Sequence, residues 1–127
     1  MSTVQVQLDR AHLIARMKRG KDHAGPILCE QILQDCNQYS VPDDGEHTLK
    51  DSGRVERLGE DFAVTWNEVY GPHQFYGCWP DGTHQIKHHT QGYTQNPSIR
   101  WTDTAEARYG KDWETVAQRE FVRGAGG

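Results

Sequence analysis

The sequence is poor in the residues that build a large core or a covalent framework. Of its 127 residues, 35% are hydrophobic, and the mean hydropathy is −0.87. The three cysteines are an odd number and include no C-x-x-C pair, which argues against a disulfide framework and favours reduced thiols. Length and composition therefore predict one domain over residues 1–127 with a thin core, and we expect neighbouring subunits to add to its stability.

Long apolar runs and an excess of basic charge are also missing. No segment resembles a signal peptide or approaches the roughly 20 apolar residues that span a bilayer, so we expect a cytoplasmic protein without membrane contact. The formal net charge is −4, and lysine and arginine look scattered along the sequence. This pattern argues against nucleic acid as the ligand, because gripping phosphates requires clustered basic side chains.

The first forty residues show apolar spacing that is mostly helical. Residues 1–8 alternate weakly between polar and apolar, which predicts an extended arm, either an edge strand or a segment laid on a neighbour. A first short helix is expected from Asp9, a possible N-cap, to Gly20. A second helix is expected to start at Pro26, which suits a first helical position. The apolar stripe of this second helix consists of Leu28, Ile32, Cys36 and Tyr39.

A corner rich in turn residues ends the second helix. Proline fixes its own φ, and aspartate and glycine favour tight turns, so Gly45 is expected to adopt a positive φ. Adjacent Asp43 and Asp44 could be a catalytic carboxylate pair, but beside proline and glycine they are predicted to cap and turn the backbone. The predicted structural corner consists of Pro42, Asp44, Gly45, Leu49 and Ser52.

The rest of the chain reads as a hairpin, a loop and a final helix. Residues 52–58 and 61–66 are predicted strands joined by a turn at 59–60, and residues 67–77 a short helix or helical turn. An exposed loop is expected around residues 79–95. A C-terminal helix should begin at a cap on Thr102 or Thr104, with a bend or break at Gly110 and a flexible tail over residues 123–127. The fold class is therefore α+β, with N- and C-terminal helices packed on a small, mainly antiparallel sheet.

Large aromatic residues replace aliphatic ones as candidates for the core and for interfaces. Tryptophan at position 79, on the exposed loop, is the better candidate for a contact with another chain. The predicted core residues are Leu28, Ile32, Cys36, Trp66, Tyr70, Trp101 and Trp113. The candidate interface residues are Trp79, His84, His88 and His89.

The histidines of this loop also raise metal binding, which would allow a small metal-dependent hydrolase. In a strand, His84 and His88 share a face but His89 points away, and no cysteine or carboxylate at ligand spacing completes a site. No nucleophile elbow, P-loop or H-E-x-x-H motif is present. We therefore predict no enzyme activity, no catalytic residues, no metal and no cofactor, and we interpret these histidines as solvated or interface residues.

An ordered series of short motifs resembles a known family. It includes residues 34–42 (QDCNQYSVP), the corner, residues 64–70 (VTWNEVY), residues 74–77 (QFYG), and Arg100-Trp101 followed by residues 109–113 (YGKDW). Together these motifs, over residues 27–113, resemble the minor capsid proteins of tailed bacteriophages. They are similar to the small neck, or head-tail connection, proteins of long-tailed phages.

The resemblance implies a virion structural protein without catalytic activity, assembled in the host cytoplasm and located at the neck between head and tail. Implied partners are other copies of the chain in a closed ring of about six or twelve subunits. An adaptor or head-closure protein would lie on one side, and a tail-terminator or tail-tube protein on the other. Genomic DNA would pass through without sequence-specific binding. A tail-terminator or head-closure ring subunit and a cytoplasmic adaptor that binds one partner chain remain alternatives.

Overall fold

The structure is a computed structural model that describes residues 5, 7, 9–43, 45, 47–67, 75, 94–98 and 100–126. Along the chain, helix α1 (Arg10–Tyr39) is followed by the short helix α2 (Thr48–Asp51), strands β1 (Gly53–Leu58) and β2 (Asp61–Trp66), and helix α4 (Trp101–Gly124). The prediction of an α+β fold with N- and C-terminal helices and an antiparallel sheet is confirmed.

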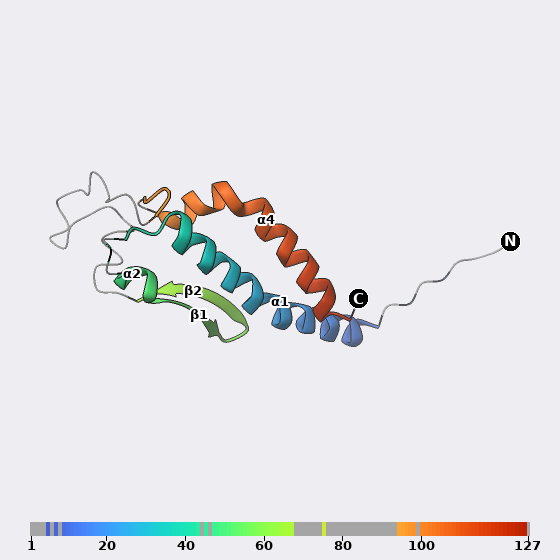
Figure 1. The fold of residues 1–127 in the computed structure, drawn as a ribbon. Helices are drawn as coiled ribbons and strands as arrows, with labels where there is room; N and C mark the ends of the chain where they lie inside the picture. The colour runs from blue at the N-terminus through green and yellow to red at the C-terminus, as the bar shows by residue number, and fades with distance from the viewer. Residues whose placement is uncertain are drawn as a thin grey trace.

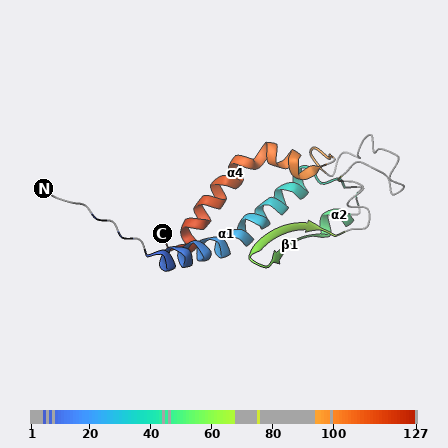
Figure 2. The same cartoon turned by 180° about the vertical axis from the view of Figure 1, so that it is seen from behind.

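Helix α1 is the central element of the fold. Helix α4 packs along one flank of α1, and the β1–β2 hairpin lies against another, so α1 separates the two (Figures 1 and 2). Strands β1 and β2 are antiparallel, with Gly53 opposite Trp66 and Leu58 opposite Asp61. The predicted hairpin is therefore correct to within one residue, and Gly59 in its turn has a positive φ of 64°.

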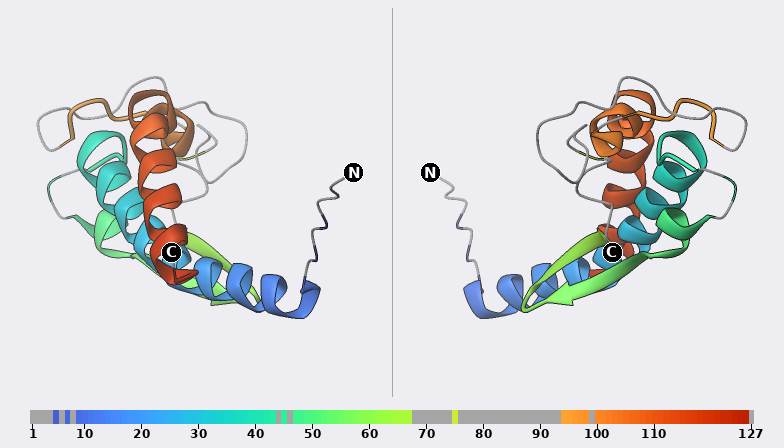
Figure 3. Two further views of the ribbon diagram at one scale, coloured as in Figure 1. Left: turned by 90° about the vertical axis from the view of Figure 1, so that its right-hand side faces the viewer. Right: turned by 90° about the vertical axis from the view of Figure 1, so that its left-hand side faces the viewer.

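Two expected breaks in helices are wrong. Helix α1 runs through Gly20 and Pro26 as one element of 30 residues, and α4 runs through Gly110. Proline removes a backbone donor from the helix interior and therefore bends a helix that tertiary contacts hold together. Figure 3 shows this bend, since the first turns of α1 point in a different direction from the rest of the helix. Packing against α4 and the hairpin overrides the local preference for a break.

The two ends of α4 also differ from the expectation. Its N-cap is Arg100, which has a left-handed φ of 46° and makes no side-chain cap, so neither predicted threonine caps the helix. Thr104 instead accepts a hydrogen bond from the Ser98 hydroxyl at 2.8 Å. At the other end, α4 includes Arg123 and Gly124, which were expected in the tail, and Ala125 is buried.

The core lies where the C-terminal end of α1 meets the start of α4. Its buried members are Cys36, Val41, Leu49, Trp101 and Ala105, and Ile32, Trp66, Phe75 and Trp113 pack against them. The Trp101 ring makes edge contacts with the Trp66 and Phe75 rings, with centroids 5.6 and 4.9 Å away. Large aromatics thus fill a core with few aliphatic residues, as the composition indicates.

Candidate assembly surfaces

The predicted corner is organised by Asp43, the aspartate that precedes Asp44. The buried Asp43 carboxylate accepts hydrogen bonds from the backbone N–H groups of Gly45 at 2.9 Å and His47 at 3.1 Å. The His47 ring also contacts this carboxylate, and the Lys50 ammonium lies 3.3 Å away. Asp43 therefore holds the turn and the start of α2 to the end of α1.

The hydrogen bonds of Asp43 change its acidity. Burial alone would raise the pKa of this carboxyl above its ordinary value of 3.8, but hydrogen bonds from Gly45, His47 and Lys50 together hold the pKa below it. The group is therefore an anion at neutral pH, and its contacts mark it as a structural anchor. Among the described residues, no group of three histidine, cysteine, aspartate or glutamate side chains could hold a metal ion here or elsewhere.

The predicted corner residues have separate roles in this turn. Gly45 has a φ of 100°, the conformation that was expected of it, and Pro42 and Leu49 are buried. The Ser52 hydroxyl donates a 2.6 Å hydrogen bond to the Leu49 carbonyl and so closes α2. Asp44 lies outside the described residues. The place of Asp44 in the corner therefore stays a prediction. Sequence analysis left Asp43 out of the corner set, although the D-x-G spacing of an Asx-turn pointed to it.

The end of α1 is closed by polar contacts from residues 94–98. Backbone N–H groups of Asn96 and Ser98 donate to the carbonyls of Tyr39 and Ser40, at 2.7 and 3.2 Å. The Thr94 hydroxyl donates to the Val41 carbonyl at 2.7 Å. These bonds satisfy carbonyls that a helix end leaves free. The described end of the predicted exposed loop is thus joined to the core, and Thr94 is buried.

Several predicted core residues lie at this end of the molecule. Cys36 and Trp101 are buried, with Trp101 only 3% exposed, while Ile32, Trp66 and Trp113 are partly buried against them. The Trp66 and Trp113 indoles donate to Asn37 and Asp35 of α1, at 2.9 and 2.8 Å. Predicted residues Tyr70, Trp79, His84, His88 and His89 lie outside the described residues.

The cysteine thiols of α1 are buried and chemically quiet. Burial, with a smaller contribution from the Asp35 charge, raises the pKa of Cys36 to about 12. Burial and the neighbouring Glu30 also raise the pKa of Cys29. Both thiols therefore stay protonated at neutral pH and behave as small apolar groups, which is how the sequence was interpreted.

The other end of the molecule carries an apolar groove of about 920 Å³ between α1, the hairpin turn and the last turns of α4. We call it the apolar groove. Its apolar lining includes Ile14, Met17, Leu28, Phe62, Ala117 and Phe121. Glu60 and Asp61 lie at its edge on the hairpin turn, and Lys18 and Lys21 lie on α1. Sequence analysis did not identify this surface, because its residues come from three distant segments.

The first ten residues of α1, which we call the α1 tip (residues 10–19), extend past the hairpin, and the first turns of the tip extend past the end of α4 (Figure 3). Arg16 and Arg19 lie beside the end of α4. Almost all of the tip is exposed, including Leu13 at 45%, Ile14 at 59% and Met17 at 53%. Helical apolar side chains usually face a core. Here they extend the apolar lining of the groove along a helix that nothing in the described chain covers.

The α1 tip is also the most basic part of the described chain. It contains four arginine and lysine residues and no carboxylate, whereas all 18 acidic residues lie elsewhere. Basic side chains are therefore not simply scattered, as the sequence suggested. They gather on one exposed helix end, and this cluster escapes notice because the net charge of the whole chain is negative.

Two glycines bring α1 and α4 into close contact beside the groove. A Cβ atom on Gly20 would lie 2.9 Å from Phe121, and one on Gly124 would lie 2.5 Å from the His23 Cβ. One turn along, the buried Glu120 carboxylate contacts the His23 ring at 2.9 Å and the Arg123 guanidinium at 2.9 Å. The crossing is thus fixed by close backbone approach and by a buried carboxylate.

The hydrogen bond from His23 is the main reason that the pKa of Glu120 lies below its ordinary value of 4.5. Burial opposes this effect, and Arg119 and Arg123 reinforce it. The carboxylate therefore remains charged at neutral pH, and it holds α4 on α1 where the groove begins.

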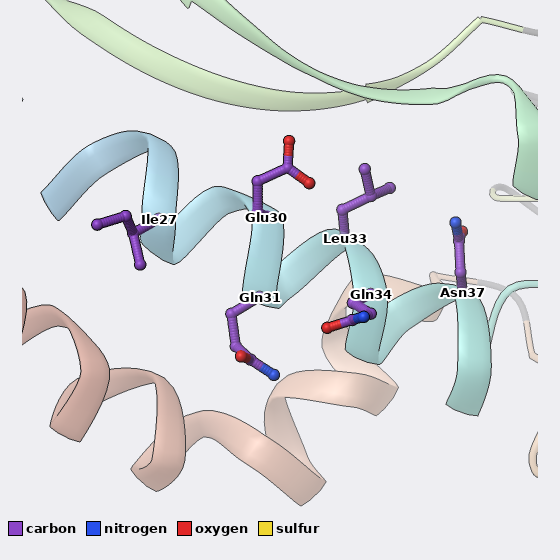
Figure 4. Close-up of a pocket in the computed structure, with 6 residues that line it drawn as sticks. All are labelled: Ile27, Glu30, Gln31, Leu33, Gln34 and Asn37. Atoms are coloured by element: carbon purple, nitrogen blue, oxygen red, sulfur yellow. The ribbon is translucent and has the colours of Figure 1, made fainter. Parts of the chain in front are cut away.

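A second groove of about 550 Å³ lies on the opposite side of α1, and four of the six residues that line it are polar (Figure 4). Glu30, Gln31, Gln34 and Asn37 line it with Ile27 and Leu33. Figure 4 shows Glu30 and Leu33 directed to the hairpin and Gln31 to α4. The two open faces of α1 therefore differ in chemistry, and the apolar one is the stronger candidate for contact with another protein.

Comparison with known proteins identifies the family of the chain. None of the described helices is long and apolar enough to cross a membrane. No curated protein and no solved structure matches the sequence significantly. A protein family described as minor capsid protein matches residues 3–121, which is almost the entire chain. The chain therefore belongs to the minor capsid protein family and is a structural protein of a phage virion.

Proposed function

We propose that the chain is a ring-forming neck subunit that joins the DNA-filled head to the tail. The observation that carries this proposal is the uncovered apolar surface of the α1 tip and the apolar groove, in a member of a family of structural proteins. A subunit with a thin core that exposes Leu13, Ile14 and Met17 is suited to stabilisation by neighbours.

The proposed partners follow from the position in the neck. Copies of the chain form the ring, an adaptor or head-closure protein contacts one side, and a tail-terminator or tail-tube protein contacts the other. Genomic DNA passes through the ring without sequence-specific contact. The mostly acidic body outside the α1 tip suits this passage, because a strongly basic lumen would hold the phosphates.

A stop codon early in the phage gene tests the function. Cells infected with this phage should accumulate DNA-filled heads and complete tails that are not joined, visible by negative-stain electron microscopy. Supplying the wild-type chain from a plasmid should restore joined particles. In wild-type virions, an antibody against the chain should label the head-tail junction. Normal joining without the chain, or labelling over the capsid faces, would refute the neck position.

A further inference from the structure

The charge of the α1 tip is placed where a helix on its own is least able to stabilise it. The N-terminal end of a helix carries partial positive charge and favours acidic side chains. The Asp9 carboxylate caps this end by accepting from the His12 N–H at 3.1 Å, but the first turn of α1 contains no acidic residue, and Arg10 and Arg16 lie close by. Of these, Arg16 donates to the Ala125 carbonyl at 3.1 Å. The tip is therefore suited to contact with an acidic surface outside its own helix.

The apolar groove offers both chemical features that would complement the tip. Its floor is apolar, and the hairpin turn adds two exposed carboxylates at its edge, Glu60 and Asp61, while Lys18 and Lys21 lie on the α1 side. Asp61 is paired with Lys21 at 2.9 Å. Glu60 makes no ion pair with any residue that the structure describes. A basic helix with an apolar stripe would bury the stripe on the floor and place cations near this edge.

The tip shares Ile14, Met17 and Lys18 with the groove of its own chain, and the part of the tip outside that groove favours a head-to-tail contact. Leu13 is exposed on the tip and does not line the groove, whereas Phe62 and Ala117 line the groove far from the tip. A symmetric contact between two tips would place eight basic residues together without a carboxylate. Contact of one tip with the groove of the next copy repeats around an axis, and it forms a ring when the rotation between copies closes.

Nucleic acid would use only part of this surface. Phosphates could pair with the arginine and lysine side chains, but they would leave Leu13, Ile14 and Met17 exposed to water. A protein groove covers both the apolar and the charged groups of the tip. The surface therefore fits a protein partner better than DNA.

We propose that the α1 tip of each copy docks in the apolar groove of the next copy, with Leu13 entering the groove and the basic side chains near Glu60 and Asp61. This inference rests on the proposed ring function and names the surfaces that form the ring. The occupant of the groove is a second copy of this chain.

Disulfide trapping tests the contact in a variant that carries both Leu13→Cys and Ala117→Cys. The bond of interest joins Leu13→Cys of one copy to Ala117→Cys of the next. Leu13 lies 11 residues before Ala24, which lines the groove with Ala117, so about 16 Å of helix separates the tip position from this part of the groove. A disulfide requires Cα atoms within about 7 Å, so the two positions within one folded chain are too far apart to be joined. A bond between them therefore reports contact between two copies.

Virions carrying the double variant should be oxidised with copper phenanthroline and separated on a non-reducing gel. Head-to-tail docking gives a ladder of multimers, because every chain offers one tip and one groove. Dimers alone would show a twofold contact, and monomers alone would show that tip and groove do not meet. Adducts with another virion protein would identify a different occupant. Each of these three results would overturn the inference.

Single variants provide matched controls. In a Cys29→Ser background, a mixture of purified Leu13→Cys and Ala117→Cys chains should stop at dimers, because each chain then offers only one thiol to the contact. Multimers from Leu13→Cys alone should disappear when the native Cys29, which also lines the groove, is changed to serine. DNA shifted by the purified wild-type chain in a gel, and no longer shifted after Arg10→Ala and Lys18→Ala, would instead assign the tip to nucleic acid.

The proposed neck function and the proposed contact of tip and groove can be refuted by different results. Immunolabelling of the neck and the unjoined heads test the function of the subunit in the virion, whatever surface forms the ring. A labelled neck without a ladder would retain the neck function and reject this contact. If the double variant yields no virions, the concentrated purified chain is oxidised in the same way and should give the same ladder. Its unfolding temperature shows whether the variant is folded.

Discussion

The two ends of the molecule treat their exposed groups in opposite ways. At the corner, polar side chains form hydrogen bonds within the chain, as those of Asp43, Ser40 and Thr94 do. The Trp101 ring there packs against other aromatic rings. At the α1 tip, apolar and basic side chains extend into solvent without a covering element among the described residues. The comparison assigns stability to the corner and assembly to the tip, and each assignment can be tested by substitution.

The largest effect on stability should come from Asp43→Ala. The change leaves the Lys50 ammonium and two backbone N–H groups without the carboxylate that they contact. We expect a loss of about 3 kcal/mol in the free energy of unfolding, because removing one partner of a buried charged network leaves the others unsatisfied. Urea unfolding followed by circular dichroism measures this loss.

Asp51→Ala serves as the control for this variant. Asp51 is an exposed aspartate in the neighbouring helix α2, so its removal should change the free energy of unfolding by less than about 0.5 kcal/mol. Equal effects of the two substitutions would contradict the role given to the Asp43 carboxylate.

Acidic pH should destabilise the fold at both ends of the molecule, through protonation of Asp43 at the corner and of Glu120 at the crossing of α1 and α4. The folded chain holds the pKa of Asp43 and Glu120 below their ordinary values of 3.8 and 4.5, so the unfolded chain binds more protons as the pH falls. Their stabilisation is complete above about pH 5 and decreases below about pH 4, as each group is protonated in the folded state. Asp43→Asn and Glu120→Gln should each flatten this decrease in thermal unfolding, and an unchanged slope would refute the assignment.

A smaller effect is expected where α4 crosses α1. In Gly124→Ala, the new methyl group would lie 2.5 Å from the His23 Cβ and 2.8 Å from the Arg19 carbonyl oxygen. Overpacking costs about 1–3 kcal/mol, and the higher helix propensity of alanine offsets about 1 kcal/mol of it. The net loss of unfolding free energy should be about 0–2 kcal/mol.

Gly110→Ala is the matched control in the same helix. Its methyl group would meet only the Glu106 Cγ at 3.5 Å, so helix propensity alone should stabilise the chain by about 0.5–1 kcal/mol. A lower unfolding temperature for Gly124→Ala and a higher one for Gly110→Ala would show that the close contact lies at Gly124. The same sign for both would show that the helices do not approach closely at Gly124.

The smallest effect on stability and the largest on assembly should come from Leu13→Ser. Leu13 is 45% exposed, so the free energy of unfolding should change by less than about 0.5 kcal/mol. Joined phage particles should nevertheless become rare, which counting by electron microscopy measures. Normal joining would show that the tip does not take part in assembly, and a large loss of stability would show that the tip is part of the core.

Local sequence signals were enough to predict the hairpin, the two helical ends of the chain and the positive φ of Gly45. Strand periodicity, a glycine turn and the proline-containing corner each act over a few residues, so one sequence is sufficient to locate them. The ordered motifs likewise indicated the family that the match over residues 3–121 confirms.

The remaining features depend on contacts between distant segments. Helix α1 continues through Gly20 and Pro26 because α4 and the hairpin support it, and neither neighbour can be placed from local pattern. Residues from α1, the hairpin turn and α4 line the groove, so no single stretch of sequence indicates it. The anchoring role of Asp43 was missed for a simpler reason, since both adjacent aspartates favour a turn and only the D-x-G spacing with Gly45 separates Asp43 from its neighbour.

The contact between Gly20 and Gly124 joins one of the first helical turns that the ribosome makes to one of the last. A nascent chain grows from its N-terminus, and α1 can therefore form before α4 is available to it. Phe121 and Ala117 complete the groove only after this late segment has been translated. A nascent chain thus presents its α1 tip before its own groove is complete. Under the proposed docking of tip in groove, a copy can receive a neighbour's tip only after its α4 has folded onto α1.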